Sequence, residues 1–276
     1  MNSSILFTAI RAALEAGKEI MTVYTDPDAD FEIERKADNS PLTIADKKAH
    51  GKIVSILKAT PYPVLSEEGK DIPVEERLKW QELWIVDPLD GTKEFIKRNG
   101  EFTVNIAYVK NGIPEAGVIY IPVKKELYFS DADFGAYKVN EIESSDLQNI
   151  SSLSALTEKA EQLPYKNISR TEFIIVASRS HLNEETQKYI EDMQQKHRHV
   201  KTVSSGSSLK LCLIAEGKAD VYPRFAPTME WDTAAGDAIV RASGGNVFQA
   251  GKDTPLSYNK PDLKNPWFIA TLQKKA

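Results

Sequence analysis

The residues with the clearest capacity for chemistry are two aspartates in the segment Leu83–Thr92. Its apolar first part is typical of a buried strand, and the proline and glycine after it indicate a turn. Asp87 and Asp90 lie three positions apart across the rigid Pro88, so both carboxylates can face one point beyond the strand end. Neighbouring carboxylates raise each other's pKa unless a positive charge lies between them. Mg²⁺, a hard ion that binds one or two carboxylates together with water and phosphate oxygens, fits this pair.

Gly91 and Thr92 begin the next apolar segment, and its first backbone amides are expected to be free to bind an anion. Metal and phosphate are therefore expected side by side. Two other interpretations stay open for the motif alone. It can be an acidic turn in which Thr92 or Asp90 caps a helix. It also resembles the Asp-x-Asp-Gly-Thr loop of haloacid-dehalogenase-type phosphatases, although here two residues separate the aspartates instead of one.

Three further acidic positions fit the same site. Asp46 has capping-box spacing with Thr43, so it is either a helix cap or a base or outer metal ligand in the first turn. Glu67, followed by Glu68, ends a short apolar run 20 positions before the aspartate pair, as a second strand end that delivers a carboxylate. Asp232 is predicted to be the N-cap of a helix that begins at position 233, and from there its carboxylate can also reach a metal.

Composition limits the class of protein. The chain has 276 residues, 41% of them hydrophobic, which suffices for one large domain or two moderate ones. A net charge of -5 argues against binding to a nucleic-acid polymer, but not against a small anionic ligand. No apolar run reaches the roughly 18 residues of a membrane span, and we expect neither a signal peptide nor an anchor. The single cysteine, Cys212, fits a reducing cytoplasm. Peripheral association with the inner membrane stays open, although no amphipathic stretch predicts it.

The elements that must position these residues divide the chain into two halves. Short connections between apolar runs predict an antiparallel meander covered by two early helices, with the metal site, over residues 1–150. Alternating strands and helices predict an α/β half that carries the substrate-binding loops over residues 151–276. We expect helices over 5–24 and from 43, and strands over 31–36, 63–66, 83–87, 102–109, 116–121, 127–129 and 135–139. A loop-rich crossover is expected over 140–170. In the second half we expect strands over 173–177, 200–203 and 220–222, and helices over 181–195, 207–216 and 233–243.

Taken together, three motifs resemble the Mg²⁺-dependent, lithium-sensitive phosphatase superfamily of inositol monophosphatase and fructose 1,6-bisphosphatase. They are Glu67-Glu68, the segment 84–92 and the segment 230–236, in the expected order. The resemblance implies a layered α+β or α/β sandwich with alternating α-β-α-β-α layers. Within the superfamily, the continuation over 91–96 and the segments 206–210 and 222–225 are similar to the bacterial 3'(2'),5'-bisphosphate nucleotidase branch. That branch is implied to convert 3'-phosphoadenosine 5'-phosphate to AMP during sulfate assimilation and nucleotide recycling.

The resemblance also implies roles for individual residues. Glu67, Asp87 and the Leu89 carbonyl are implied to bind one Mg²⁺, and Asp87, Asp90 and Asp232 a second; a third ion is implied near Glu67 and Asp46. The Thr92–Asp46 pair is implied to orient and deprotonate the attacking water in a two-metal reaction.

The implied substrate contacts lie around that site. The amides of Gly91 and Thr92 would hold the scissile phosphate. Positive charge for the other phosphate would come from Lys93, Arg179, Lys210 and Arg224, and Ser205, Gly206 and Ser207 would line the ribose or adenine side. Asp232 is also expected beside the substrate. The partner is thus a small phosphorylated nucleotide, while the oligomeric state is not predicted. A phosphatase of inositol or sugar phosphates and a non-catalytic nucleotide sensor are the alternatives.

Overall fold

The computed structural model describes residues 3–28, 30–36, 41–178 and 183–272. Its first sheet is built from strands whose apolar side chains alternate between two faces, so that both faces must be covered. On β4 (Glu82–Asp90), Trp84 packs into one core and Ile85 into the other. The order of this sheet is β3 (Val64–Ser66), β4, β5 (Thr103–Lys110), β6 (Ile113–Ile121), β7 (Glu126–Asp131), β8 (Gly135–Val139) and β9 (Glu161–Leu163). The β3–β4 pair is parallel and the other neighbours are antiparallel.

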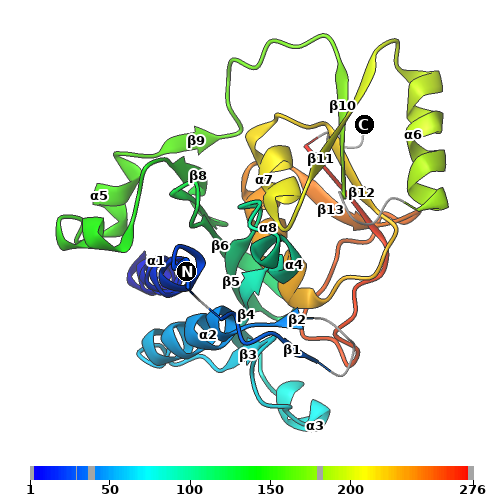
Figure 1. Cartoon of the computed structure of the whole chain (residues 1–276). Coiled ribbons are helices and arrows are strands. Elements are labelled where there is room, and N and C mark those ends of the chain that lie inside the picture. Colours follow the sequence, from blue (N-terminus) through cyan, green and yellow to red (C-terminus); the bar gives the residue numbers. More distant parts are fainter. Residues whose placement is uncertain (1–2, 29, 37–40, 179–182, 273–276) are drawn as a thin grey trace.

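Two N-terminal helices cover the outer face of this sheet, as predicted. They are α1 (Ser3–Tyr24) and α2 (Ile44–Leu57) (Figure 1). The predicted strand 31–36 is shorter, because only β1 (Glu34–Arg35) pairs, with β2 (Pro41–Leu42). Short helices α3 (Val74–Arg77) and α4 (Thr92–Ile96) flank β4 in sequence.

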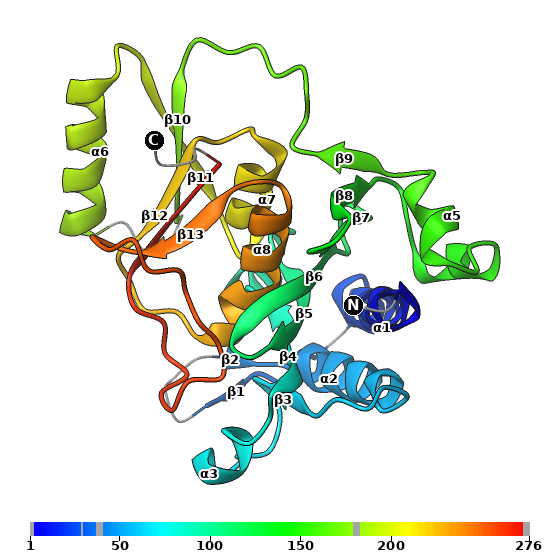
Figure 2. The ribbon, with the colours of Figure 1, turned by 180° about the vertical axis from the view of Figure 1, so that it is seen from behind.

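The second sheet lies on the far side of two helices, α7 (Leu209–Glu216) and α8 (Glu230–Ala242) (Figure 2). Its strand order is β11 (Val200–Ser205), β10 (Phe173–Ser178), β12 (Val221–Arg224), β14 (Phe268–Thr271) and β13 (Asn246–Gln249). Helix α6 (Glu184–Lys196) covers its outer face, where Ile190 packs on Ile175 and Val221. The five alternating layers confirm the predicted fold class, while β13 and β14 were not predicted.

The region expected to be loop-rich, residues 140–170, contains some short elements. These are the 3₁₀ helix η1 (Ser144–Gln148), α5 (Leu153–Thr157) and β9. Because β9 pairs with β8, the first sheet continues past residue 150. The division of the chain into two halves at residue 150 stays a prediction.

Small residues let α8 approach both of its neighbours. A Cβ on Gly117 of β6 would lie 2.3 Å from the Ala235 carbonyl oxygen of α8, and a Cβ on Gly236 would lie 2.3 Å from Leu211 Cδ1 of α7. A larger side chain at Gly117 would push α8 away from the first sheet, and one at Gly236 would push α7 away from α8. None of the described helices combines the length and the apolar composition that a membrane span requires.

Candidate active site

An irregularity in β4 places the two aspartates of the motif. The pairing of β4 with β5 shifts register between Asp87 and Asp90, so these residues do not follow simple strand alternation. Asp87 is buried, and its Oδ1 accepts a hydrogen bond from the Leu89 amide at 3.0 Å. Gly91 follows with φ of 98°, and a Cβ there would lie 2.9 Å from the Glu101 carbonyl oxygen. Only glycine suits this turn from strand to helix.

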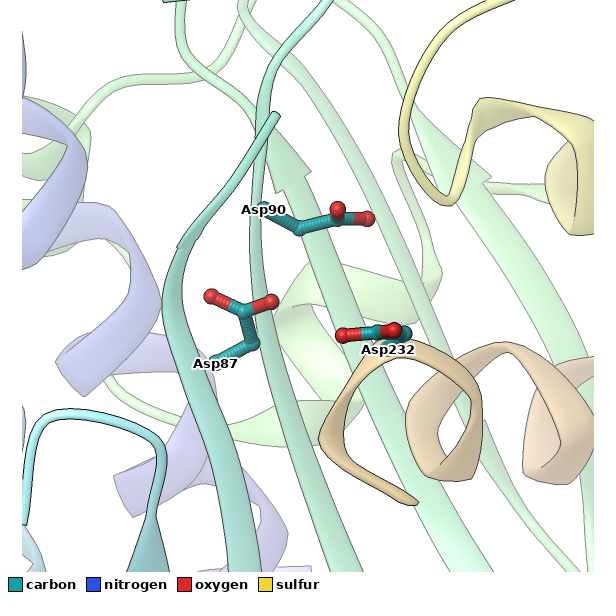
Figure 3. A group of neighbouring side chains, drawn as sticks. All are labelled: Asp87, Asp90 and Asp232. Atoms are coloured by element: carbon teal, nitrogen blue, oxygen red, sulfur yellow. The ribbon is translucent and has the colours of Figure 1, made fainter. Parts of the chain in front are cut away.

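Asp232 completes a group of three carboxylates. Helix α8 begins at Glu230 rather than at 233, so the prediction that Asp232 is the N-cap is wrong. Asp232 lies in the first turn instead and accepts a hydrogen bond from the Met229 amide at 2.8 Å. Figure 3 shows its carboxylate directed toward those of Asp87 and Asp90, and one ligand oxygen of each residue lies within 4.8 Å of the others.

The electrostatics of this group fit a cation. Burial and the neighbouring carboxylates raise the pKa of Asp87 well above its usual range. Burial, and then the charge of Asp90, raise the pKa of Asp232 to about 8. These shifts reflect negative charges held together without a positive charge between them. Hard carboxylate oxygens in this arrangement suit Mg²⁺.

Glu67 lies beside this group. Burial raises the pKa of Glu67, which also exchanges a side-chain hydrogen bond with Asp87. Its Oε1 accepts a hydrogen bond from Lys36 Nζ at 2.6 Å, and Lys36 also binds Glu68. Glu67 lines the pocket that opens over Asp90 and Asp232 and Glu68 does not, which supports Glu67 as the ligand of the two. Lys36 was not predicted, because a single lysine in a polar loop has no distinguishing pattern.

Asp46 forms the capping box that its spacing predicted, while its role as a base or outer metal ligand stays a prediction. It forms a capping box with Thr43, whose amide and hydroxyl donate to Asp46 Oδ2 at 2.8 and 2.5 Å. Its other oxygen, Oδ1, accepts a hydrogen bond from Thr92 Oγ1 at 3.2 Å. Asp46 is 1% exposed, and burial raises its pKa. The cap therefore fixes the carboxylate that contacts Thr92.

The serine loop before α7 binds the acidic group instead of capping the helix. Ser207 Oγ and Ser208 Oγ donate to Asp90 Oδ2 at 2.7 and 2.8 Å. Two residues of β5 that were not predicted join them: Thr103 Oγ1 lies 2.7 Å from Ser207 Oγ, and Asn105 Nδ2 donates to Ser208 Oγ at 2.9 Å. Their signal in the sequence was two polar residues within an otherwise apolar strand.

A pocket of about 360 Å³ opens over these groups. The predicted site residues that line it are Glu67, Asp90, Gly91, Thr92, Lys93, Gly206, Ser207, Lys210, Arg224 and Asp232. The predicted residues that do not line it are Asp46, Asp87, Leu89 and Ser205. The Ser205 carbonyl accepts a hydrogen bond from Lys210 Nζ at 3.3 Å, and the Gly206 amide, although part of the lining, donates to Glu101 Oε2 at 2.8 Å. Arg179 lies outside the described residues.

Two cations of the pocket differ in how they are held. Lys210 is 5% exposed and donates to the Ser207 carbonyl oxygen at 2.5 Å. Burial, and then the charge of Arg224, lower the pKa of Lys210 to about 8, although Asp90 acts in the opposite direction. Arg224 donates through Nη2 to the Pro227 carbonyl oxygen at 3.0 Å, while its buried Nε has no partner among the described residues. Both cations thus retain capacity to bind an anion.

Comparison with known proteins agrees with this geometry. Residues 1–275 match the model of the inositol monophosphatase family, and the chain belongs to this family. The 3'(2'),5'-bisphosphate nucleotidases CysQ of Salmonella typhimurium and of Escherichia coli K12 are each 45% identical to it, over 94% of this chain and 96% of the relative.

Solved structures with the same fold agree with the assignment to this family. The crystal structure of CysQ from Bacteroides thetaiotaomicron superposes with a TM-score of 0.90 at 59% identity and covers 99% of both chains. The extragenic suppressor protein SuhB of Bartonella henselae superposes with a TM-score of 0.71 at 26% identity, over 98% of this chain and 94% of that one. The resemblance inferred from the motifs is therefore confirmed at the level of family and fold.

Proposed function

We propose that this protein is a Mg²⁺-dependent 3'(2'),5'-bisphosphate nucleotidase that hydrolyses 3'-phosphoadenosine 5'-phosphate to AMP and phosphate. The observation that carries the proposal is that one pocket is lined both by Asp90 and Asp232 of the convergent carboxylate group and by a buried cation, Lys210. A substrate with one scissile and one retained phosphate needs both. The names of the relatives at 45% identity state the same activity.

The acidic group is proposed to hold the metal. Glu67, Asp87 and the Leu89 carbonyl would bind one ion, and Asp87, Asp90 and Asp232 a second, with a third near Glu67 and Asp46. Mg²⁺ bound there supplies the positive charge that makes the attacking water acidic and stabilises the leaving oxygen. The burial of Asp87 supports this assignment, since buried carboxylates without a cation are costly.

Thr92 and Asp46 are proposed to orient and deprotonate the water. Because Thr43 holds Asp46 Oδ2, the free oxygen Oδ1 is directed to Thr92 Oγ1. Thr92 Oγ1 donates a hydrogen bond to Asp46 Oδ1 and can accept one from the water. As the water attacks phosphorus in line, its proton would pass to Thr92 Oγ1 while the Thr92 hydroxyl proton passes to Asp46, which ends protonated. The raised pKa of Asp46 improves it as a proton acceptor.

The remaining pocket residues are proposed to bind the nucleotide. The amides of Gly91 and Thr92 hold the scissile phosphate, and Lys210 and Arg224, helped by the exposed Lys93, hold the other phosphate. Ser205, Gly206 and Ser207 line the ribose or adenine side, and Asp232 lies beside the leaving oxygen. We place the reaction in the cytoplasm, where the single cysteine stays reduced.

The test is phosphate release with Mg²⁺ from 3'-phosphoadenosine 5'-phosphate, inositol 1-phosphate and fructose 1,6-bisphosphate, each with and without lithium. We expect the nucleotide to be turned over with the highest kcat/KM and lithium to inhibit. Preference for either sugar phosphate would refute the substrate assignment and keep the metal site. No release from any of the three, with nucleotide binding intact in Asp46→Asn, would favour a sensor.

A further inference from the structure

Asp90 is held by the loop that precedes α7, and the hydrogen bonds that its side chain accepts from the described residues all end on one oxygen. Ser207 and Ser208 donate to Oδ2 at 2.7 and 2.8 Å, and Asn105 Nδ2 approaches the same atom at 3.4 Å. The other oxygen, Oδ1, is left to offer to a cation. One carboxylate thus belongs both to the acidic group and to the wall of the nucleotide pocket.

Ser208 contacts Asp90 instead of capping helix α7 with its side chain. It occupies the N-cap position of α7, where a serine hydroxyl usually accepts a hydrogen bond from the first turn. Its side chain makes no such bond here. The hydroxyl is instead shared between Asp90 Oδ2 and the Asp232 carbonyl oxygen, at 2.8 and 2.9 Å, and it accepts from Asn105. Ser208 and Asn105 are 3% and 1% exposed, so water does not replace these contacts.

Further contacts hold the other residues of the loop 205–208. Ser207 has a left-handed φ of 48°, a conformation that is unfavourable for serine and must be compensated by its surroundings. Lys210 Nζ binds its carbonyl oxygen and Thr103 contacts its hydroxyl. Glu101 accepts from the next amide upstream, that of Gly206. Asp90 thus holds Ser207 together with these neighbours, so a displacement of its carboxylate reaches the loop that faces the nucleotide through Ser207 and Ser208.

We propose that Ser208 and Asn105 are positioning residues that couple metal binding at Asp90 to nucleotide binding at the loop 205–208. This proposal rests on the proposed function of the pocket. A cation that fixes the Asp90 carboxylate also fixes the loop, and a nucleotide that orders the loop also orients Asp90. By linkage, each ligand then raises the affinity for the other by the same factor.

The first test is Mg²⁺ binding without nucleotide, measured by isothermal titration calorimetry on Ser208→Ala. We expect Mg²⁺ affinity to fall by about 10- to 100-fold, which is the usual effect of removing an outer partner of a metal ligand. Ser130→Ala is the matched control, because Ser130 is also buried but its hydroxyl has no partner among the described residues. Unchanged Mg²⁺ affinity in Ser208→Ala would overturn the proposal.

The second test isolates the coupling itself. The dissociation constant of AMP is measured without Mg²⁺ and at Mg²⁺ concentrations that saturate each protein, for the unmutated protein and for Ser208→Ala. Any direct contact between metal and phosphate is present in both proteins, so a difference between the two ratios reports the path through Ser208. We expect the factor by which Mg²⁺ raises the affinity for AMP to be at least about fivefold smaller in Ser208→Ala than in the unmutated protein. Fivefold is the lower end of the usual range of coupling between two sites. Equal ratios would contradict the proposal.

Two controls separate the outcomes. If Ser208→Ala does not fold, as judged by circular dichroism, the less buried Ser207→Ala removes the other strong hydrogen bond to Asp90 and is tested in the same way. If the unmutated protein hydrolyses the nucleotide and Ser208→Ala keeps the full coupling, only this inference is refuted. If Ser208→Ala loses the coupling and the unmutated protein prefers a sugar phosphate, only the substrate assignment is refuted.

Discussion

The buried Lys210 makes the use of a bisphosphate dependent on pH. Its pKa is lowered from 10.5 to about 8, mainly by burial. At 1.36 kcal/mol per unit, charging this lysine in the ligand-free protein costs about 3 kcal/mol. As pH rises through about 8, the folded protein releases this proton before the unfolded chain does. The stability cost is thereby relieved between about pH 8 and 10.5, but the cation that binds the second phosphate is lost.

The assay compares kcat/KM for 3'-phosphoadenosine 5'-phosphate with kcat/KM for adenosine 3'-phosphate between pH 6.5 and 9.5. A charge-assisted hydrogen bond contributes about 1.5–3 kcal/mol, which sets a loss of at least about 10-fold when Lys210 is neutral. At pH 9.5 roughly 3% of a lysine with a pKa of about 8 still carries its proton, so the ratio should fall by about 10- to 30-fold over this range. Dividing by the monophosphate removes any pH effect on the shared chemistry. Lys210→Ala should have a low ratio at every pH. A ratio that is flat with pH, or equal losses on both substrates in Lys210→Ala, would refute the reasoning.

Three further predictions follow from the buried charges. Asp87→Asn should abolish phosphate release by removing a ligand shared between two metals; substantial residual turnover in a steady-state assay would contradict that role. Mg²⁺ at about 100 times its Kd should stabilise the protein by about 2.7 kcal/mol, seen as a rise in Tm over EDTA, and Asp87→Asn should lose most of this rise. Glu216→Ala should destabilise by about 3–5 kcal/mol in denaturant titration, because it leaves Lys138, 3.0 Å away and buried, without this partner. A loss below about 1 kcal/mol would show that Glu126, also 3.0 Å from Lys138, suffices alone.

The sequence predicted those parts of the site that depend on neighbours in the chain. Asp87, Asp90 and Gly91 follow one strand, and their spacing was enough to expect a metal beside a phosphate. The Thr43–Asp46 box was likewise visible, because a capping box is local. The apolar run before Asp87 predicted β4 and the helical period predicted α1; α1 agrees closely with its observed bounds, while β4 continues to Asp90, beyond the predicted end at 87.

What the sequence did not predict depends on contacts between distant segments. Asn105 and Thr103 contact the site only because the loop 205–208, about a hundred positions away in the chain, folds against β5. Strands β13 and β14 have four residues each, so their short patterns do not stand out from loops; β14 pairs with β12, and β13 pairs with β14. The start of α8 was misplaced because Asp232, a good N-cap by type, binds the Met229 amide from the first turn.

The central position of α8 has a consequence for synthesis of the chain. The first sheet is complete at Leu163, yet its inner face, with Leu83, Ile85 and Ile119, packs in one core with residues of α7 and α8. Those helices leave the ribosome much later, so an apolar sheet face stays uncovered during a long part of translation. Exposed surfaces of this kind favour aggregation and capture by chaperones. Ribosome-bound chains that end before Glu230 should therefore be chaperone clients, and release should coincide with the emergence of α8.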